Sequence, residues 1–270
     1  MRNILNPPKS PHGPRTESEP PERRSWPLGW LSIFIFFLIW EGIARTGWIR
    51  PIFISSPVEI IRAAGWLLEH GYWRDLFVSA TEFFTGLAIA MLIGLPLGVL
   101  VGWYRSVSAS LEPFITGLYS TPRVALMPLL VLWLGIGAAS KIAVVVLGAV
   151  FPVLVSTMSG VRSVDEELLT CARSFGASDR QVFLTLALPA SVPYIISGFR
   201  LGVGRGLVGV VVGELIAARA GVGHRMNIAA ATFQTDQVFV GILVLATTGI
   251  ILNGALARLE RHFDRWRTHR

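Results

Sequence analysis

Long apolar segments dominate this sequence, and only short polar stretches separate them. A helix needs about 20 predominantly apolar residues to cross the hydrocarbon core of a bilayer. Six segments come close to that length, and most charged residues fall between them. The chain is therefore predicted to be an all-α integral membrane protein with six transmembrane helices. The candidate spans are residues 27–44, 77–102, 114–134, 140–161, 190–217 and 237–257.

Composition agrees with this prediction and excludes several function classes. Charged residues make up only 15% of the 270 residues, whereas soluble domains carry about 25%. The net charge is +7, but no basic patch with interleaved aromatic residues indicates nucleic-acid binding. The five histidines show no metal-ligand spacing. The single cysteine, Cys171, excludes an intrachain disulfide.

The N-terminal segment has a different composition from the rest of the chain. Residues 1–25 are rich in proline and charge, so they are predicted to be a disordered cytoplasmic tail. A cleaved signal peptide is the alternative, but acidic residues interrupt this leader and no small-x-small cleavage site follows. The transmembrane domain is expected over residues 26–260, with a basic cytoplasmic tail over 261–270.

Basic residues predict the orientation of the spans. With the N-terminus in the cytoplasm, the inner connections hold twice as many Lys and Arg as the outer ones. Such an excess is typical of cytoplasmic connections. Both termini, and the connection between the fourth and fifth spans, are therefore expected in the cytoplasm.

Proline and glycine punctuate three of the spans. Pro113, Pro122, Arg123 and Pro128 interrupt the third span, which is predicted to be broken or to begin along the membrane surface. Glycines at every fourth residue form stripes on two other spans and let a neighbouring backbone approach closely. We expect tight helix packing at Gly94, Gly98, Gly102, Gly198, Gly202 and Gly206.

The connection at residues 163–189 is polar and strongly patterned. Ser163 and Glu166 have the spacing of a capping box, as do Ser178 and Gln181. Two short helices are therefore predicted in this connection, the first from about residue 164 to 175.

Further signals make this connection a helical hairpin. Gly176 is suited to end the first helix in the left-handed conformation, and Pro189 is expected to help end the second. One face of the first helix is apolar, which suits docking into a groove on a partner. The alternative is a linker helix that lies on the membrane surface. The apolar face consists of Leu168, Leu169, Ala172 and Phe175.

This hairpin resembles the cytoplasmic loop of permease subunits in binding-protein-dependent ATP-binding cassette (ABC) importers. The family pattern is Glu-Ala-Ala, three residues, Gly, nine residues and Ile-x-Leu-Pro. The spacing is kept here, although the Glu and the first Ala are replaced. The residues at the patterned positions are Thr170, Cys171, Ala172, Gly176, Leu186, Leu188 and Pro189.

The resemblance extends over about residues 28–258. The stretches WEGIARTGWIRPIFISSPVEII, TPRVALMPLLVLWLGIG and SGFRLGVGRGLVGVVVGELIAARAGVGHRM are similar to permeases of the nitrate, sulfonate and taurine type. The family's usual Leu-Pro-Ser-Pro reads Ile54-Ser55-Ser56-Pro57 here.

The resemblance implies a type I importer transmembrane domain in a bacterial inner membrane. Two such subunits, expected as a homodimer surrounded by lipids, would form the pathway for a small oxyanion. Two ATPase subunits would bind the hairpins, and an external binding protein would deliver the solute. ATP and Mg²⁺ would bind the ATPase, and no cofactor would bind this chain. The expected ATPase-coupling residues are Thr170, Cys171, Ala172, Phe175, Gly176, Leu186, Leu188 and Pro189.

The chain itself is not expected to be an enzyme. It has no Gly-x-x-x-x-Gly-Lys-Ser/Thr motif to hold ATP phosphates. A membrane-embedded enzyme would need clustered His, Asp or Glu, which the sequence lacks. A secondary transporter or channel working without ATP is the alternative function, although no clear inverted repeat supports it.

Charged residues inside the spans are candidates for the solute pathway, because charge in the bilayer core is costly and faces the bundle or a wet cavity. Arg200 is expected to extend to the inner headgroups, whereas for Arg205 this role and attraction of an anionic solute both stay open. Glu214 is expected to pair with Arg219 or a neighbouring helix, and Glu82 to be interfacial. The pathway candidates are Arg123, Arg200, Arg205 and Glu214.

Overall fold

The computed structural model describes residues 26–47, 50 and 52–263. The predicted tail at 1–25 therefore lies outside the described residues. Of the predicted C-terminal tail, residues 261–263 continue the last helix and the remainder lies outside the described part. Every regular element among the described residues is helical.

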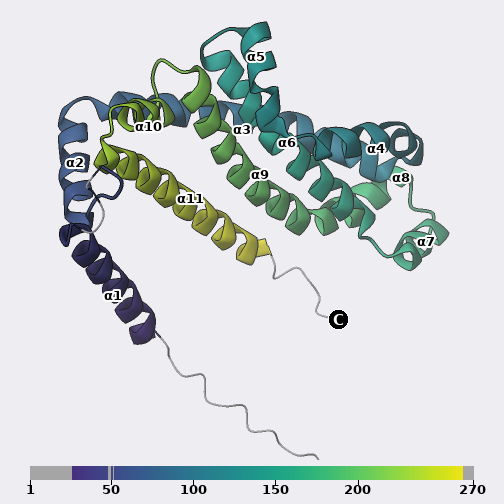
Figure 1. Ribbon diagram of the computed structural model, residues 1–270. Coiled ribbons are helices and arrows are strands. Elements are labelled where there is room, and N and C mark those ends of the chain that lie inside the picture. The colour runs from purple at the N-terminus through teal and green to yellow at the C-terminus, as the bar shows by residue number, and fades with distance from the viewer. Residues whose placement is uncertain (1–25, 48–49, 51, 264–270) are drawn as a thin grey trace, which may run out of the picture.

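The helices follow one another with short connections (Figure 1). Their bounds are α1 Trp26–Arg45, α2 Pro57–Glu69, α3 Tyr72–Trp103, α4 Arg105–Ser120, η1 Arg123–Leu126, α5 Met127–Leu134, α6 Ala138–Arg162, α7 Glu166–Ser174, α8 Asp179–Val182, η2 Phe183–Ala187, α9 Leu188–Ala217, α10 Val222–Ala231 and α11 Thr235–Phe263.

Four helical segments of the described chain are long and apolar enough to cross a membrane. They are α3, α6, the continuous stretch Asp179–Ala217, and the part of α11 over Thr235–Arg258. A fifth span results if α4 is counted with the segment Arg123–Leu134, which turns away from it by 88°. The helix predicted over residues 114–134 is thus broken between Ser120 and Arg123. The first predicted span, residues 27–44, coincides with α1, and the count of six stays a prediction.

Helix α6 is the centre of the bundle. It packs most extensively against α9 and α3, and Figure 1 shows these three helices running side by side. Their shared core includes Phe83 and Leu87 of α3, Ala149 of α6, and Val203 and Val210 of α9, all of which are buried. Between spanning helices, such side chains stabilise the bundle mainly through close van der Waals contact.

The glycine stripes of α3 and α9 both lie against α6. A Cβ atom added at Gly98 would be 2.6 Å from the Cβ of Thr157 and 2.7 Å from the carbonyl oxygen of Leu154. A Cβ added at Gly198 would be 2.5 Å from the Cβ of Ser156. These distances leave no room for a side chain, so the backbones of the three helices are in direct contact. The same holds at Gly94 and Gly102, whereas at Gly202 and Gly206 the nearest atoms are 3.2–3.3 Å from an added Cβ, so the packing there is tight but less extreme.

An ion pair between α3 and α6 gives Glu82 a partner that the sequence did not indicate. Glu82 was expected at the membrane interface, which stays a prediction; its side chain is only 5% exposed and forms an ion pair with Lys141, which is 4% exposed. The second carboxylate oxygen of Glu82 has no hydrogen-bond partner among the described residues. A buried charge needs such a partner, and this partner lies on another helix, where the local pattern around Glu82 could not reveal it.

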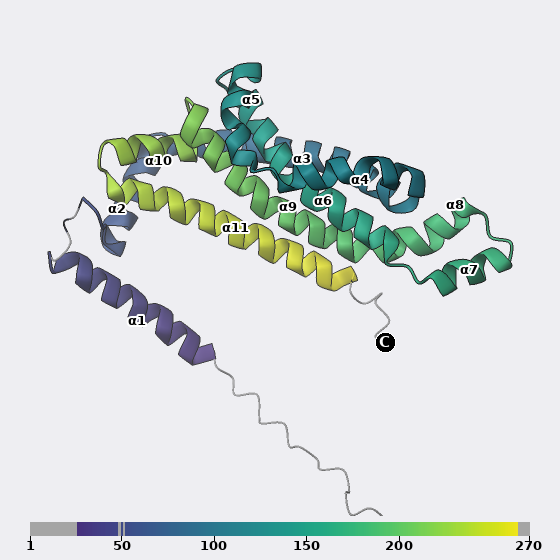
Figure 2. The same ribbon diagram turned by 45° about the vertical axis from the view of Figure 1, so that its right-hand side comes forward.

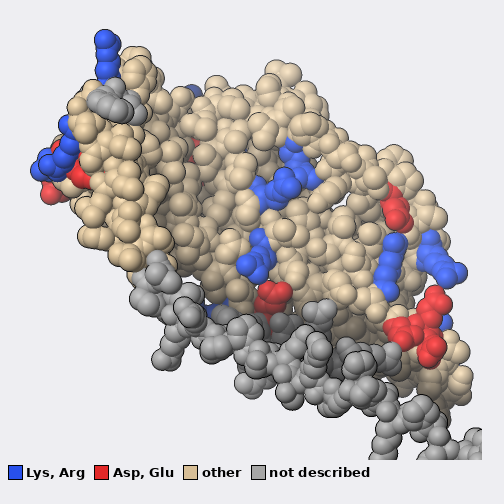
Figure 3. All heavy atoms as spheres, turned by 60° about the horizontal axis from the view of Figure 1, so that its bottom comes forward, with Lys and Arg blue, Asp and Glu red and all other residues tan. Residues whose placement is uncertain are grey.

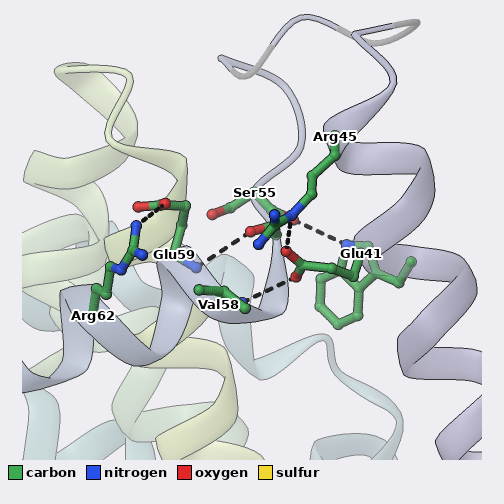
Figure 4. A network of polar contacts seen from close by, with 8 residues as sticks. Glu41, Arg45, Ser55, Val58, Glu59 and Arg62 are labelled. Atoms are coloured by element: carbon green, nitrogen blue, oxygen red, sulfur yellow. Dashed lines mark hydrogen bonds and ion pairs between the residues drawn. The ribbon is translucent and has the colours of Figure 1, made fainter.

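Polar contacts fasten α1 to the start of α2 (Figure 4). The Glu41 carboxylate accepts a hydrogen bond from the Val58 amide at 3.2 Å and forms an ion pair with Arg45 at 2.5 Å. The Trp40 indole N–H donates to the carbonyl oxygen of Ser55 at 2.9 Å. The bond to Glu41 satisfies the Val58 amide at the N-terminal end of α2, which has no earlier turn to bond with.

The close packing on α6 makes a testable prediction. Gly98→Ala should lower stability by about 1–3 kcal/mol, because the new methyl group overlaps backbone and side-chain atoms of α6. Gly65→Ala is the matched control: this glycine is exposed within α2 and its added Cβ meets nothing within 4 Å. The control should be neutral or gain about 0.5–1 kcal/mol. Thermal unfolding of the purified protein in detergent measures both, and equal midpoints for the two variants would contradict the packing described.

Candidate functional site

The polar hairpin between α6 and α9 has a different N-cap from the one predicted. Asp165 caps α7, and its carboxylate accepts a hydrogen bond from the Glu167 amide at 2.9 Å. The predicted capping box of Ser163 and Glu166 is wrong. The Ser163 hydroxyl instead donates to the carbonyl oxygen of Gly160 at 2.8 Å, at the end of α6. Because α6 extends to Arg162, Ser163 serves the helix before it and not the helix after it.

The end of α7 is fixed by backbone hydrogen bonds. Gly176 has a φ of +81°, in the left-handed region. Its amide donates to the carbonyl oxygen of Arg173 at 2.9 Å, and the Ala177 amide donates to that of Ala172 at 3.2 Å. This pair of bonds is a Schellman motif. The capping box of Ser178 and Gln181 then opens α8 as predicted. The turn between the two helices is therefore a defined structure.

The hairpin continues directly into α9. Pro189 was expected to help end the second helix, and this expectation is wrong, because residues Asp179–Ala217 form one helical stretch of 39 residues. A π-helical turn at Phe183–Ala187 lies immediately before the proline. A proline has no N–H and its ring collides with the carbonyl group one turn earlier. The wider turn accommodates both effects, so the helix bends locally and continues.

The hairpin exposes apolar surface at its tip and buries its base. Phe175 is 88% exposed and Leu168 is 50% exposed. Val182 is fully buried, and the Phe183 ring lies edge-on against Trp103 at 5.2 Å between ring centroids. Figure 2 shows α7 and α8 projecting past the end of the α3–α6–α9 bundle. A stiff base thus holds an exposed apolar tip.

The residues predicted to couple to an ATPase divide between these two parts. Thr170, Cys171, Phe175, Gly176 and Pro189 are exposed. Ala172, Leu186 and Leu188 are partly buried. The first group is open to a partner, and the second helps to set the position of the hairpin.

Sequence reasoning missed the contacts behind the hairpin. A cavity of about 1050 Å³ separates α7 from the junction of α3 and α4. At its wall, an Arg162 guanidinium nitrogen donates to the Ser108 hydroxyl at 2.6 Å and lies 3.4 Å from the Glu112 carboxylate. Arg173 and Asp179 form an ion pair at 3.3 Å across the hairpin. Ser108 and Glu112 are one helical turn apart, a spacing that could have suggested a shared partner.

Two of the pathway candidates lie beside one cavity along α9. This cavity, of about 700 Å³, is lined by Arg200 and Arg205 together with Asn253 of α11. Arg200 donates to the Asn253 side-chain oxygen at 3.4 Å and pairs with the Glu260 carboxylate at 3.5 Å. Its guanidinium group is therefore held by α11. The Arg200 side chain is partly neutralised within the protein.

Arg123 lies at the break in the third predicted span. Its guanidinium carbon is 5.2 Å from the ring centre of Tyr119 and 5.4 Å from that of Phe151. One of its terminal nitrogens donates to the carbonyl oxygen of Tyr119 at 3.0 Å. Aromatic faces attract a cation at such distances. Arg205 is close enough for its charge to act on that of Arg123.

Glu214 is placed in a separate network. It is only 1% exposed and accepts hydrogen bonds from the Ser79 hydroxyl at 2.5 Å and the Gly223 amide at 2.7 Å. Glu214 was expected to pair with Arg219 or with a neighbouring helix. The structure shows the second of these, a contact with α3. Nearby, Asp75 of α3 accepts from the Gly221 amide at 2.8 Å. These carboxylates fasten the connection between α9 and α10 to α3.

A second ion pair completes this network. Arg225 of α10 lies 2.6 Å from the other Asp75 oxygen. Sequence analysis did not single out Asp75, Ser79 or Arg225. The two α3 residues are one helical turn apart and could have indicated a shared face. No group of three or more His, Cys, Asp or Glu side chains suited to a metal ion occurs in the part of the chain that the structure describes.

Comparison with known proteins identifies the family. Residues 94–266 match the profile of the binding-protein-dependent transport system inner membrane component. The taurine transport system permease protein TauC of Escherichia coli K12 is 33% identical over 261 residues, which cover 94% of this chain and 95% of TauC. The putative aliphatic sulfonates transport permease protein SsuC of Bacillus subtilis is 32% identical over 91% of this chain and 90% of its own.

A solved structure shows the same fold. The methionine ABC transporter MetNI, in an inward-facing conformation, contains a chain that matches with a TM-score of 0.57 and 22% sequence identity. The match covers 73% of this chain and 96% of that one. The importer-type transmembrane fold expected from the sequence is thus confirmed, and ATP hydrolysis resides on a separate subunit. The chain belongs to the family of binding-protein-dependent transport system inner membrane components, as the multi-pass permease subunit of an ABC importer.

Proposed function

We propose that this permease binds an ATPase subunit through the α7–α8 hairpin and that two copies form the pathway for a small oxyanion of the sulfonate type. The observation that carries this proposal is the exposed apolar tip on a fully capped, rigidly based hairpin. Phe175 is 88% exposed, although burying a phenylalanine side chain is worth about 1.5–3 kcal/mol. Such a side chain on a stiff support suits a groove on a partner.

The continuity of the hairpin with α9 supports a coupling role. A movement of the ATPase would reach α8, pass through the π turn at Phe183–Ala187 and rotate or shift α9. Arg200 and Arg205 are carried on that helix and line its cavity. ATP and Mg²⁺ bind the ATPase in this scheme, and this chain contributes the moving wall of the pathway. The coupling set consists of Thr170, Cys171, Ala172, Phe175, Gly176, Leu186, Leu188 and Pro189.

The proposed arrangement has six spans, with both termini and the hairpin in the cytoplasm. α1 supplies the first span and the broken α4–α5 segment the third. The excess of basic residues at the inner connections supports this orientation. The external binding protein would dock on the opposite side, where α2 and α10 lie.

Exposed apolar residues on α5 support the proposal that a second copy of this chain completes the pathway. Leu132 is 79% exposed and Trp133 is 66% exposed, on a segment that turns away from α4 by 88°. A segment at this angle cannot bury both faces against its own bundle. A homodimer would cover it and would enclose the cavities along α9 between two permease subunits.

The relatives and the charge of the pathway support a sulfonate-type solute. TauC is a taurine permease by name, and SsuC is named for aliphatic sulfonates. Both classes of solute carry a sulfonate group. Three arginines, Arg123, Arg200 and Arg205, lie within the spans of this chain, and cationic side chains favour passage of an anion.

Removing the exposed ring tests the coupling proposal. Phe175→Ala should weaken binding of the ATPase subunit by about 10- to 100-fold, the equivalent of 1.5–3 kcal/mol of lost burial. ATP-driven uptake of labelled taurine by the complete importer should fall in parallel. The matched control is Ser174→Ala, one residue earlier on α7, which should leave binding and uptake unchanged. Normal ATPase binding by Phe175→Ala would defeat the proposal.

The only cysteine of the chain tests the orientation. Cys171 is exposed on α7, so a membrane-impermeant maleimide should modify it in inside-out vesicles and leave it unmodified in intact spheroplasts. Adding the ATPase should protect it in the vesicles, because the partner would cover this side of the hairpin. Modification in spheroplasts would place the hairpin outside the cell and exclude contact with an ATPase.

A further inference from the structure

Two arginines in the middle of the spans lack a counter-charge. Arg123 and Arg205 form no ion pair with any carboxylate among the described residues, whereas Arg200 pairs with Glu260 at 3.5 Å. Arg205 also has no hydrogen-bond partner in that part of the chain. Charges held in a bilayer are normally paired or wetted. The two guanidinium groups therefore require an anion or water.

The depth of Arg205 excludes lipid headgroups as that anion. Arg205 lies 17 residues after Leu188, the first residue of α9, which corresponds to about 26 Å along the helix. Its distance from the last residue, Ala217, corresponds to about 18 Å. With a hydrocarbon core of about 30 Å, this position is near the midplane. Phosphate groups of lipids lie at the two surfaces and cannot reach it.

Arg123 is held in place but is not fully satisfied. The rings of Tyr119 and Phe151 lie within 5.2 and 5.4 Å of its guanidinium carbon. Its Nε atom is buried and has no hydrogen-bond partner among the described residues. It follows the break between α4 and η1, and irregular backbone at membrane depth is tolerated only inside protein or beside a wet cavity. Phe151 lies on α6 one turn from Gly148, where an added Cβ would be 3.0 Å from the carbonyl oxygen of Arg205. The break thus places a fixed donor against the same part of α6 that α9 contacts at Arg205.

Space for a ligand is present beside Arg205. The cavity of about 700 Å³ is lined on one side by Leu201, Gly204 and Val208 of α9. A Cβ atom added at Gly204 would meet nothing within 4 Å. Figure 3 shows basic side chains in the middle of one face, with one acidic side chain beside them and uncharged surface between them and the charged groups at both ends. An anion could therefore approach a guanidinium group with apolar surface around it.

We propose that Arg123 and Arg205 form a midmembrane site that holds the sulfonate group of the solute during passage. A guanidinium presents parallel N–H donors that match two oxygens of such a group. The site rests on the proposed function, since only a permease with an anionic solute would fill it. It also assigns different roles to the four pathway candidates: Arg200 is bound to α11, and Glu214 fastens the outer connection.

A carboxylate from a second copy cannot replace the solute. The acidic residues of α3 and α9 in the outer half of the bundle are all buried and already bound. They are Asp75, bound to Gly221 and Arg225, Glu82, bound to Lys141, and Glu214, bound to Ser79. A copy of this chain therefore has no free carboxylate at that depth among its described residues. It would bring a second Arg123 and Arg205 instead, which strengthens the positive field.

Site-directed labelling measures that field without relying on transport. In the complete importer, Gly204→Cys is made in a Cys171→Ser background and reacted with two methanethiosulfonates of similar size, one carrying a sulfonate and one a quaternary ammonium group. Relative to each reagent's own rate with a small free thiol in solution, the anionic reagent should react about tenfold faster than the cationic one, as local attraction predicts. Arg205→Gln should reduce that normalised ratio to about three or less. Equal normalised rates, or a ratio unchanged by Arg205→Gln, would overturn the proposal.

Uptake by the complete importer in proteoliposomes is the second measurement, with labelled ethanesulfonate as the probe. Arg123→Gln and Arg205→Gln should each lower uptake by about tenfold or more. The control, Arg74→Gln, changes an exposed arginine at the outer start of α3 and should keep normal uptake. Normal uptake by both pathway variants would overturn the site.

Recovery of the ATPase separates this proposal from the coupling proposal. The pathway variants should retain the ATPase and its basal hydrolysis within about twofold, whereas loss at the hairpin removes the ATPase itself. If a variant loses the ATPase, the charge preference at Gly204→Cys decides the matter, because it needs no ATP. Protection of that cysteine by ethanesulfonate should also disappear in Arg205→Gln, and protection that persists there would count against the site.

Discussion

Direct backbone contact along α6 is the constraint on which the rest of this structure depends. Gly98 and Gly198 bring α3 and α9 against the same stretch of α6, at residues 152–157, with no glycine side chain to separate the helices. Lipid offers little hydrophobic driving force between helices, so close van der Waals contact has to supply the stability. The candidate functional segments are all attached to this unit of α3, α6 and α9. The hairpin extends from α6 and α9, and the broken α4–α5 segment and α11 lie beside the three-helix unit.

A glycine-lined contact also permits movement. Smooth surfaces can slide without unpacking interlocked side chains, which suits a small shear between packed helices. The π turn before Pro189 joins the hairpin to α9 without a loop. In the proposed coupling scheme, a displacement at the exposed tip would therefore be passed to the helix that carries Arg205. The same bundle that provides stability would thus provide a route for mechanical coupling.

Local patterns predicted local structure well and long-range partners poorly. The apolar runs located the long helices, and the Ser178 capping box was confirmed. The capping box predicted at Ser163 was wrong because a serine between two helices can bond either to the end of the first or to the start of the second. The helix end predicted at Pro189 was wrong because the π-helical turn before the proline lets the helix continue. The pairing of Glu82 was missed because its partner, Lys141, is distant in sequence, and only the folded bundle joins them. The proposed anion site was predictable in residue type alone, since only the fold brings Arg123 and Arg205 against the same helix, α6.

The buried pair of Glu82 and Lys141 has a consequence for biogenesis. The two residues lie on different helices, with the broken α4–α5 segment between them in the chain. During synthesis the carboxylate therefore reaches the membrane well before the ammonium group has left the ribosome. An unpaired charge inside a span is costly, so α3 is expected to stay near the translocon until α6 arrives. Assembly of this subunit is thus expected to follow a fixed order, in which α3 packs against α6 only after α6 has been synthesised.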